Sequence, residues 1–404
     1  MQPLLQPSRP GTSHVLGSVG VLSDAEALAL SDADGTTLQA LADQAAAVRD
    51  STYGATLTFS PKAFFPITNL CRNRCDYCSF RKSPGDAGAH TMTHDEVVSW
   101  LSRARAAGCT EALYCLGDKP EGAFSAYRAT LATLGHTSTV DYLDWAGHAA
   151  LAHGLLPHTN AGVLTRDDML RLRSTNVSLG LMLENISPRL CQKGMAHHRA
   201  PDKRPERRVR MIAEAGELAI PFTTGILIGI GETRRERVES LLAIRELHAR
   251  HGHIQEVIVQ NFTARPEIPM AEVPEQSDRE MQHAVALARL ILPPEISLQA
   301  PPNLNPQRTQ LLIGAGINDF GGISPVTPDY INPRHPWPHL TRLAEDCSRA
   351  GFTLQPRLPI YERYSADPRW LAAALREPVR VAMERLQHTS FFARPPAASL
   401  LQVV

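Results

Sequence analysis

The sequence carries no excess charge of either sign, because its 404 residues include 41 Lys plus Arg and 41 Asp plus Glu. A balanced charge gives no net field to draw the protein to nucleic acid or to an anionic membrane, so a small or neutral substrate is favoured. The sequence also lacks an apolar run of about 20 residues that could span a membrane. Its first twenty residues have neither the basic start nor the long apolar stretch of a secretion signal. We therefore expect a flexible N-terminus and a cytoplasmic protein.

Cysteine is scarce, and most of it is dispersed. Of seven cysteines, four lie far apart along the chain, namely Cys109, Cys115, Cys191 and Cys347. An odd number of cysteines spread over a long chain excludes the disulfide framework of a small secreted domain. We expect these four to be small buried residues in a protein from a reducing compartment.

From residue 56 onward the sequence alternates between two patterns. Short β-rich runs predict strands at residues 56–68, 111–117, 154–160, 177–185, 221–232, 256–262 and 296–303. Amphipathic stretches predict helices at residues 93–108, 165–175, 205–216, 234–252 and 277–292. Such alternation is typical of parallel strands joined by right-handed helical crossovers. Counted through residues 311–319, the number of βα units comes close to eight, so we expect an α/β fold with a TIM-like (βα)8 barrel.

The chain is long enough for one large barrel, and its 43% hydrophobic content is ample for a sizeable core. No repeat, low-complexity tract or Gly/Ser linker divides it. We expect a flexible N-terminus and a helical cap in residues 1–50, the barrel in residues 51–335, and a C-terminal extension packed on the barrel in residues 336–404.

The stretch "NLCRNRCDYCSFRK" places Cys71, Cys75 and Cys78 within eight residues. They could share one face of a helix as core residues, but Pro66 lies just upstream and the intervening residues are charged or polar. A structural zinc site needs four ligands, usually from paired C-x-x-C knuckles, and no second knuckle is present. Three thiolates suit a [4Fe–4S] cluster that keeps one iron open for substrate or cofactor.

The spacing C-x3-C-x2-C resembles the signature of the radical S-adenosylmethionine (SAM) superfamily. This resemblance implies a [4Fe–4S] cluster on these three cysteines, with its open iron chelated by the amino and carboxylate groups of SAM. It further implies that reduction of the cluster splits SAM into methionine and a 5′-deoxyadenosyl radical, which abstracts hydrogen from the substrate. The fold expected is then a radical SAM barrel.

Other segments resemble the parts of such a site that bind SAM. Tyr77 matches the aromatic residue whose backbone meets the adenine. In "LYCLGDKPEG", Gly117, Asp118 and Glu121 stand where the superfamily has a "GGE"-like motif that receives the SAM amino group, with Asp118 in place of the second Gly. The alternative interpretation is a plain glycine turn with solvated charges.

Two later strand ends complete the expected SAM site. Glu184 follows an apolar strand, where a carboxylate can accept hydrogen bonds from ribose hydroxyls or an ammonium group; a satisfied salt bridge is the alternative. The run "GILIGIGE", which includes Gly229 and Glu232, resembles the superfamily's G-x-I-x-G-x-x-E motif, in which a glycine-rich strand end admits the adenine. A bulge or close packing is the alternative for its glycines.

Longer strings narrow the resemblance. "PITNLCRNRCDYCSFRKSPGD", "CLGDKPE", "GLMLENISPRLCQKGMAHHRAPDKRPERR", "VIVQNFTARPEIPM" and "GINDFGGISPVTPDYINP" resemble the CofG-type subunits of 7,8-didemethyl-8-hydroxy-5-deazariboflavin (FO) synthase. Because "RNRC", "LGDKPE" and "QKGMAHH" have no generic role in binding a cluster or SAM, we take them as evidence for a particular substrate.

This resemblance implies a place in coenzyme F420 biosynthesis. A CofH-like partner would join a tyrosine-derived p-hydroxybenzyl group to 5-amino-6-(ribitylamino)uracil, and this chain, as a lyase, would close the deazaflavin ring with loss of ammonia. A low-potential electron donor of the flavodoxin or ferredoxin type is also implied. Candidate residues for the ribityl chain or the uracil are His197, His198, Gln260, Asn261, Asn318 and Asp319. Each of these could instead be a solvated loop residue, a turn former or a helix cap.

Two other functions remain open from the sequence. One is another radical SAM ring-forming enzyme, such as CofH itself, a menaquinone-pathway enzyme or a biotin-synthase-like protein, although no second clustered set of ligands is seen. The other, from a different class, is a non-catalytic iron–sulfur or zinc module. Such a module would need a fourth protein ligand and would not need a barrel that accommodates SAM.

Overall fold

The computed structural model describes residues 21–392, so the flexible start expected for residues 1–20 lies outside the described residues. Eight parallel strands form a closed barrel, because β1 pairs with β8 on one side and with β2 on the other. The barrel strands are β1 (Thr56–Phe65), β2 (Glu111–Cys115), β3 (Leu156–Asn160), β4 (Ser178–Gly180), β5 (Phe222–Ile228), β6 (Ile254–Asn261), β7 (Ser297–Gln299) and β8 (Asp319–Ile323). The predicted TIM-like barrel is confirmed.

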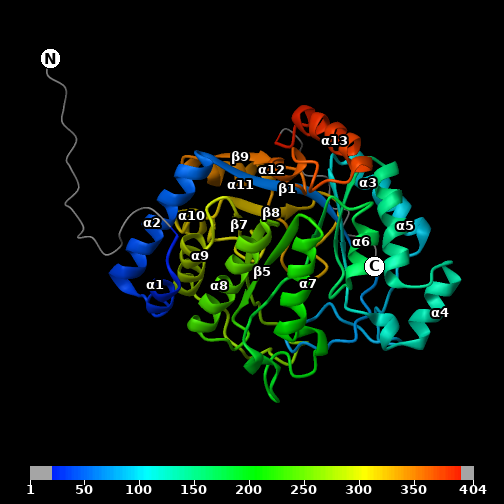
Figure 1. The fold of residues 1–404 in the computed structure, drawn as a ribbon, viewed down its shortest axis with the longest axis horizontal. Helices are drawn as coiled ribbons and strands as arrows, with labels where there is room; N and C mark the ends of the chain where they lie inside the picture. The colour runs from blue at the N-terminus through cyan, green and yellow to red at the C-terminus, as the bar shows by residue number, and fades with distance from the viewer. Residues whose placement is uncertain (1–20, 393–404) are drawn as a thin grey trace.

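Helices link the strands and surround the barrel (Figure 1). They are α3 (His94–Ala106), α4 (Ser125–Thr133), α5 (Thr139–Ala152), α6 (Arg166–Leu172), α7 (Pro205–Glu217), α8 (Arg234–His251), α9 (Asp278–Ile291) and α10 (Thr309–Gly314). Short 3-10 turns lie at Pro120–Gly122, Pro188–Cys191, Pro201–Lys203 and Ala373–Leu375. Helices α3, α6 and α8 each begin at a threonine that forms a capping box with an acidic residue three positions later. These boxes fix where each helix starts after its loop at the open end of the barrel.

The N-terminal helices α1 (Asp24–Ala29) and α2 (Gly35–Tyr53) lie against the outside of the barrel. Figure 1 shows them in blue beside α9 and α10, and α2 packs mainly on α9. The buried Arg49 of α2 donates hydrogen bonds to the carbonyls of Ile313 (2.7 Å) and Ile317 (3.0 Å). These bonds tie α2 to the segment that leads into β8.

The C-terminal part adds a strand that the sequence patterns did not predict. After α11 (Leu340–Arg349), β9 (Thr353–Pro356) pairs in parallel with the first half of β1. The second half of that same edge pairs with β2. The chain then crosses the amino-terminal end of the barrel and continues through α12 (Glu362–Ser365) and α13 (Arg376–His388). This segment thereby closes the barrel at the amino-terminal ends of its strands.

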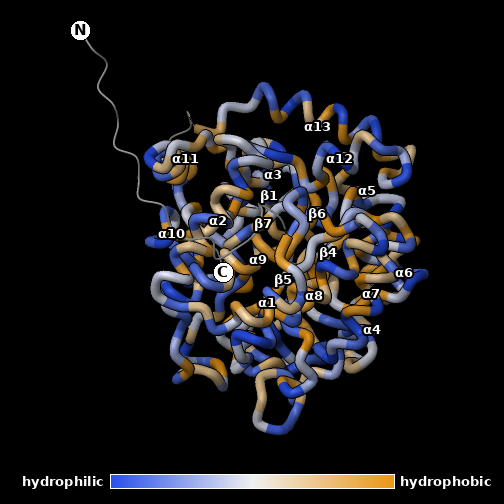
Figure 2. Tube along the Cα trace, turned by 60° about the vertical axis from the view of Figure 1, so that its left-hand side comes forward, coloured by the Kyte–Doolittle hydropathy of each residue, from blue (hydrophilic) through white to orange (hydrophobic). Residues whose placement is uncertain are grey.

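The core lies between the barrel and its helices. Every residue of β5 is buried, and Figure 2 shows hydrophobic residues concentrated on central strands such as β5 and hydrophilic residues on the outer loops. No helix within residues 21–392 is long and apolar enough to cross a membrane. The opening that remains is at the carboxyl ends of the strands, where the site is built.

Candidate functional site

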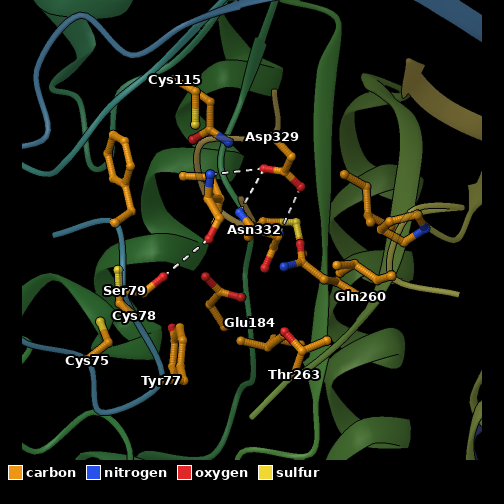
Figure 3. Close-up of a pocket in the computed structure, with 18 of the residues that line it drawn as sticks. Cys75, Tyr77, Cys78, Ser79, Cys115, Glu184, Gln260, Thr263, Asp329 and Asn332 are labelled. Atoms are coloured by element: carbon orange, nitrogen blue, oxygen red, sulfur yellow. Dashed lines mark hydrogen bonds between the residues drawn. The ribbon is translucent and has the colours of Figure 1, made fainter. Parts of the chain in front are cut away.

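A cavity of about 310 Å³ opens at the end of the barrel where the parallel strands finish. Its wall includes the last residues of β2, β3 and β6, which are Cys115, Asn160 and Asn261. Residues 71–78, which we call the cysteine loop, contribute Cys71, Asn73, Cys75, Tyr77 and Cys78 to the same cavity. Figure 3 shows this loop on one side and Gln260 of β6 on the other. The arrangement brings the clustered cysteines to the face of the barrel where parallel α/β enzymes carry out chemistry.

The cysteine loop lies between β1 and α3 and contains no helix, so the alternative of a shared helix face is wrong for this segment. Cys71, Cys75 and Cys78 all line the cavity. The Sγ atom of Cys71 accepts a hydrogen bond from the backbone N–H of Asp118 at 3.1 Å. Burial raises the pKa of the Cys71 thiol to about 11 and that of Cys75 to about 12. Without bound iron these thiols are therefore protonated near neutral pH.

The three thiols fit a multi-iron cluster better than a single ion. Within residues 21–392, no group of three or more His, Cys, Asp or Glu side chains is gathered tightly enough to hold one metal ion. In an iron–sulfur cluster each thiolate binds its own iron, so the ligands share a cavity without converging on one point. The cysteine loop meets that requirement.

A second segment holds the cysteine loop in place. Residues 196–203, which we call the brace segment, lie directly behind it. The backbone N–H of Arg74 donates to the carbonyl of Arg199 at 3.0 Å, and the N–H of Asp76 donates to the carbonyl of Ala196 at 3.0 Å. These bonds pair the main chains on either side of Cys75.

Side chains strengthen the same contact. The guanidinium of Arg72 forms two hydrogen bonds with the buried carboxylate of Asp202, one of them 2.6 Å long. The hydroxyl of Tyr77 lies 3.1 Å from Nε2 of His197. Arg72 belongs to the "RNRC" string and His197 to the "QKGMAHH" string. Parts of both strings therefore support the cysteine loop, a role that the sequence interpretation did not assign to them.

Glu184 lies beyond β4 in a left-handed backbone conformation, with a φ of 65°. Its backbone bonds on both sides to β5, donating to Gly225 and accepting from Leu227 at 3.0 Å each. This conformation costs a non-glycine residue about 1 kcal/mol or more and persists where surrounding contacts enforce it. The Glu184 carboxylate forms an ion pair with Lys203, whose ammonium lies 5.9 Å from the centre of the Tyr77 ring. Glu184, Lys203 and Tyr77 all line the cavity.

Gly117 and Asp118 follow β2 and touch the cysteine loop. A Cβ atom on Gly117 would lie 2.5 Å from Cβ of Cys71, so glycine is required for this approach. The Asp118 carboxylate accepts a hydrogen bond from the N–H of Val163 at 3.2 Å, while its other oxygen is buried and has no hydrogen-bond partner among residues 21–392. Burial, aided by the nearby Asp202, raises the pKa of Asp118 to about 6. Asp118 thus retains an unused acceptor beside the cavity.

Glu121 lies elsewhere, and the structure places it in a structural contact. Its carboxylate accepts hydrogen bonds from the backbone N–H (3.0 Å) and the hydroxyl (2.6 Å) of Thr139, the first residue of α5. It does not line the cavity. The negative charge therefore stabilises the N-terminus of α5.

Gly229 and Glu232 shape the loop after β5 without lining the cavity. The Glu232 carboxylate accepts hydrogen bonds from the backbone N–H groups of Gly229 and Ile230 at 2.8 Å each. Its side chain is fully buried and pairs with Arg237 at 2.7 Å. Gly229 has a φ of 94°, which favours glycine. The motif "GILIGIGE" thus combines the end of β5 with a turn at residues 229–232 that the Glu232 carboxylate closes, and Leu227 of the strand part lines the cavity.

The candidate substrate residues divide into three groups. Gln260 and Asn261 line the cavity. His197 and His198 lie behind the cysteine loop, next to a smaller cavity that they line together with Cys191. Burial lowers the pKa of His197 to about 2, so this imidazole is neutral.

Asn318 and Asp319 lie at the opposite end of the barrel. Asp319 is the first residue of β8, so both precede the strand rather than follow it. Asn318 accepts a hydrogen bond from Arg289 at 2.6 Å, and Asp319 accepts one from Arg357 at 2.9 Å. The structure therefore gives them partners in the closed end of the barrel, away from the cavity.

The cavity also contains polar residues that the sequence patterns did not single out. They include Lys62, Lys203, Thr263, Arg265, Gln299, Asn303, Asp329 and Asn332. In the group visible in Figure 3, Asp329 accepts hydrogen bonds from Asn332 (3.0 Å) and Asn303 (2.9 Å). One signal was available: Lys62 places a charge inside a strand whose other residues are mostly apolar, which marks a buried group with a partner or a function.

Known proteins match the part of the chain that forms the barrel and its cavity. A sequence model of the radical SAM superfamily matches residues 65–244. The 7,8-didemethyl-8-hydroxy-5-deazariboflavin synthase of Methanopyrus kandleri is 45% identical over 84% of this chain and 100% of its own length. The corresponding synthase of Methanosarcina acetivorans is 45% identical over 83% of this chain and 97% of its own length. The FO synthase of Nocardia farcinica is 45% identical over 88% of this chain but only 43% of its own length.

Solved structures agree on the fold. The FeFe-hydrogenase maturase HydG from Carboxydothermus hydrogenoformans superposes with a TM-score of 0.67 at 21% identity, covering 92% of this chain and 86% of its own. Methylornithine synthase superposes with a TM-score of 0.64 at 18% identity, covering 83% of this chain and 94% of its own. At such identities the likeness extends to the fold alone.

Proposed function

The chain belongs to the radical SAM superfamily and, within it, to the family of 7,8-didemethyl-8-hydroxy-5-deazariboflavin (FO) synthases, and from this premise we propose that it catalyses the ring closure that forms FO. The observation that carries the proposal is the 45% identity that extends over the whole length of the Methanopyrus kandleri synthase. The superfamily implies a [4Fe–4S] cluster and SAM as cofactors.

Cys71, Cys75 and Cys78 would hold the cluster, because these three thiols line one cavity on a loop fixed by the brace segment. When bound, the cluster and SAM supply a 5′-deoxyadenosyl radical that removes a hydrogen atom from the substrate. The hydrogen bond from the Asp118 N–H to Cys71 would stabilise the thiolate form of that cysteine.

Three features support a SAM site beside the cysteine loop. The carboxylates of Glu184 and Asp118 lie at the cavity wall and can accept hydrogen bonds from an ammonium group or from ribose hydroxyls. Tyr77 lines the cavity beside them. Gly229 and Glu232 would act by setting the turn that carries Leu227 to the cavity wall, rather than by contact through the Glu232 side chain.

The substrate proposed is the adduct of a p-hydroxybenzyl group and 5-amino-6-(ribitylamino)uracil. The adduct already carries the bond between the benzylic carbon and the uracil, so ring closure needs a bond between the ribitylamino nitrogen and the phenol ring. One hydrogen leaves the benzylic carbon as an atom and a second leaves as a proton and an electron, the electron passing to a one-electron carrier, while ammonia leaves from the uracil. The chain's part is to orient the adduct and exclude water. Gln260 and Asn261 are suited to its hydroxyl and amide groups because they line the cavity.

A CofH-like partner would supply the adduct. This chain matches 43% of the length of the Nocardia farcinica FO synthase, so that protein contains a further part of comparable size. We therefore place this chain in the CofG-type role, as a lyase that acts on the product of a separate subunit. A low-potential electron donor of the flavodoxin or ferredoxin type completes the set. The seven cysteines lie within residues 21–392, and none of them forms a disulfide bond there, which fits a reducing cytoplasm.

The test is an anaerobic assay of the reconstituted protein with a CofH-type enzyme, tyrosine, 5-amino-6-(ribitylamino)uracil, SAM and a reductant. We expect FO fluorescence together with 5′-deoxyadenosine and methionine, and accumulation of the uncyclised adduct when this protein is omitted. Persistence of the adduct in its presence, with no stimulation of SAM cleavage, would refute the assignment while leaving the superfamily intact.

A further inference from the structure

The deepest part of the cavity is formed by Lys62 of β1 and Gln299 of β7, which we call the floor pair. Lys62 lies within β1 and pairs in register with Glu111, the first residue of β2. Gln299 pairs with Ile258, which precedes Gln260 on β6. The floor pair therefore lies below the rim residues of the cavity, toward the closed end of the barrel.

Two consecutive glycines of β8 make room for the floor pair. A Cβ atom on Gly322 would lie 1.2 Å from Cε of Lys62, and one on Gly321 would lie 1.8 Å from Nε2 of Gln299. Gly321 also has a φ of 66°. Glycine weakens a strand and often marks the close approach of another group. The "DFGG" part of the string "GINDFGGISPVTPDYINP" thus admits two polar side chains into the barrel.

Below the floor pair, toward the closed end of the barrel, the charged side chains form ion pairs with one another. Arg357, from the segment that crosses the closed end, pairs with Glu256 at 2.7 Å and with Asp319 at 2.5 Å. Glu111 is fully buried, yet Lys62 and other neighbouring groups outweigh the effect of burial and lower its pKa. Glu111 is therefore ionised and provides a counter-charge for the ammonium of Lys62.

The floor pair, in contrast, has unused hydrogen-bonding capacity. The ammonium of Lys62 lies 3.7 Å from Oε1 of Glu111 and 5.1 Å from the centre of the Phe64 ring, and neither contact is a hydrogen bond. Within residues 21–392, the side-chain amide of Gln299 makes no hydrogen bond to the protein. Polar groups at such depth are costly unless a ligand or water satisfies them. Both side chains line the cavity, so a ligand can reach them.

We propose that the floor pair binds the dioxopyrimidine edge of the substrate and so decides which end of that molecule enters the barrel first. This inference rests on the proposed function, because it takes the ring of FO and its precursor as the ligand. The dioxopyrimidine edge presents two carbonyl acceptors on either side of one N–H donor. The planar amide of Gln299 supplies one donor and one acceptor to that edge, and Lys62 supplies a donor to the second carbonyl.

The other ends of the substrate match the floor pair less well. The phenol has one hydroxyl group, which would leave most of the donors and acceptors of the pair unsatisfied. The ribityl chain carries only hydroxyl groups, which suit the several amide side chains nearer the rim, such as Gln260 and Asn332. Hydrogen-bond matching therefore places the pyrimidine ring deepest.

The binding test uses the reconstituted protein and two probes in anaerobic calorimetry. FO contains the dioxopyrimidine, the ribityl chain and the phenol, whereas 6-(ribitylamino)uracil lacks the phenol. Lys62→Met should weaken the binding of both probes by about tenfold or more, because both lose a charge-assisted hydrogen bond. Arg250→Met, which removes an exposed positive charge on α8 away from the cavity, is the control and should bind both probes normally. Unchanged affinity of Lys62→Met for 6-(ribitylamino)uracil would overturn the proposal, whatever happens to FO.

A second test distinguishes the room that Gly322 leaves for Lys62 from the role of Lys62 in binding the ring. Gly322→Ala should lower the unfolding temperature because its methyl group meets Lys62, whereas Gly314→Ala, where nothing lies within 4 Å, should not. In a Lys62→Ala protein, which already lacks the counter-charge of Glu111, adding Gly322→Ala should cause no further fall in the unfolding temperature, and the double variant should still bind 6-(ribitylamino)uracil weakly. Recovery of that affinity in the double variant would show that Lys62 is not a ligand of the ring.

The role of the floor pair and the formation of FO can be tested separately. If the unaltered protein forms FO but Lys62→Met retains full affinity for both probes, the floor pair is wrongly assigned and the proposed function stands. If the unaltered protein neither forms FO nor binds either probe, the proposed function fails, and the ligand assigned to the floor pair fails with it.

Discussion

The phenol oxygen of Tyr77 lies 3.1 Å from Nε2 of His197, so the aromatic residue next to Cys78 is held by a histidine of the brace segment. The His197 side chain is buried and neutral, since burial lowers its pKa to about 2. A neutral imidazole has one donor and one acceptor nitrogen and can pair with a phenol without a net charge. This contact joins two strings that are more than a hundred residues apart in the sequence.

The first prediction concerns this contact. His197→Phe preserves an aromatic ring but removes the hydrogen bond to Tyr77, which should lower the free energy of unfolding by about 1 kcal/mol. A looser cysteine loop should also release the cluster faster. The measurement is the decay of cluster absorbance in the presence of an iron chelator. His388→Phe, the same substitution at an exposed histidine of α13, is the control. Equal decay for the two variants would contradict a bracing role.

The second prediction assigns the cluster ligands. Replacing Cys71, Cys75 or Cys78 with Ala should abolish both the bound [4Fe–4S] cluster and SAM cleavage, since no thiolate would remain for one iron. The measurement is iron and sulfide content after anaerobic reconstitution, with the electron paramagnetic resonance of the reduced protein.

Cys115 provides the sharpest control for the cluster ligands. It lines the same cavity as the cysteine loop but lies at the end of β2, and burial raises its pKa to about 12. We expect Cys115→Ala to retain full iron and sulfide content. A protein in which Cys115→Ala loses the cluster while one of the three loop variants keeps it would refute the assignment.

The third prediction concerns the turn after β5. Glu232→Gln keeps the shape of the side chain but removes the negative charge that pairs with the buried Arg237. Arg237 keeps its ion pair with Glu280 at 2.5 Å, so the loss of the Glu232 charge and its hydrogen bonds should cost about 1–3 kcal/mol. Thermal unfolding should therefore show a large loss of stability, whereas Glu239→Gln, at an exposed ion pair on α8, should show almost none. Similar unfolding temperatures for the two variants would mean that Glu232 does not stabilise the turn.

Periodicity predicted much of the barrel because each strand and helix carries its own local pattern. The run "PFTTGILIGIGE" was expected as the fifth strand and is β5, and α3, α6 and α8 begin within one residue of the predicted positions. The cysteine loop was also expected to follow the first strand. Strand β4 is shorter than predicted, because the chain turns away after Gly180 and Glu184 makes only an isolated bridge to Ile226. That turn depends on tertiary contacts that no local pattern contains.

The predicted positions that differ from the structure also depend on tertiary contacts. Asn318 and Asp319 were placed near the substrate because short polar residues beside a predicted strand suggest a strand end, but β8 starts at Asp319 and their partners come from α9 and from beyond β9. Strand β9 was missed because it is held by pairing with residues 56–59 of β1, which lie before the point where β2 begins to pair with β1 at Lys62. This pairing is a tertiary contact that leaves no local pattern in the sequence. Glu121 looked like a SAM ligand by motif position, and only its contact with Thr139 reveals the helix cap.

The fourth prediction concerns pH. His158 is buried in the barrel, and burial lowers its pKa to about 4, while Nδ1 bonds with Ser178 at 2.6 Å. The unfolded chain, with an ordinary histidine pKa near 6.5, binds a proton that the folded chain does not, so stability falls as pH decreases from about 7 toward 4. Between about pH 7.5 and 5.5 this histidine alone should cost about 1 kcal/mol. His158→Gln should show a correspondingly smaller loss in urea unfolding at the two pH values. An identical pH dependence would show that His158 is not a source of acid sensitivity.

The last prediction concerns Glu184, for which binding of SAM and a satisfied salt bridge were alternative interpretations. The ion pair with Lys203 shows that the salt bridge exists, yet both side chains also line the cavity. Glu184→Gln should therefore weaken SAM binding by about tenfold or more, because it removes a charge-assisted acceptor, while iron content stays unchanged. The measurement is anaerobic titration of the reconstituted protein with SAM.

A second variant separates the two interpretations of Glu184. If the carboxylate served only to neutralise Lys203, then removing both charges in Glu184→Gln/Lys203→Met should restore SAM affinity, since no unpaired ammonium would remain. If the carboxylate binds SAM directly, the double variant should regain stability in thermal unfolding but remain weak in SAM binding. The left-handed backbone at Glu184 favours the second outcome, because strain of this kind persists where a side chain must be held in a required position. Restored affinity in the double variant would reduce Glu184 to a structural partner of Lys203.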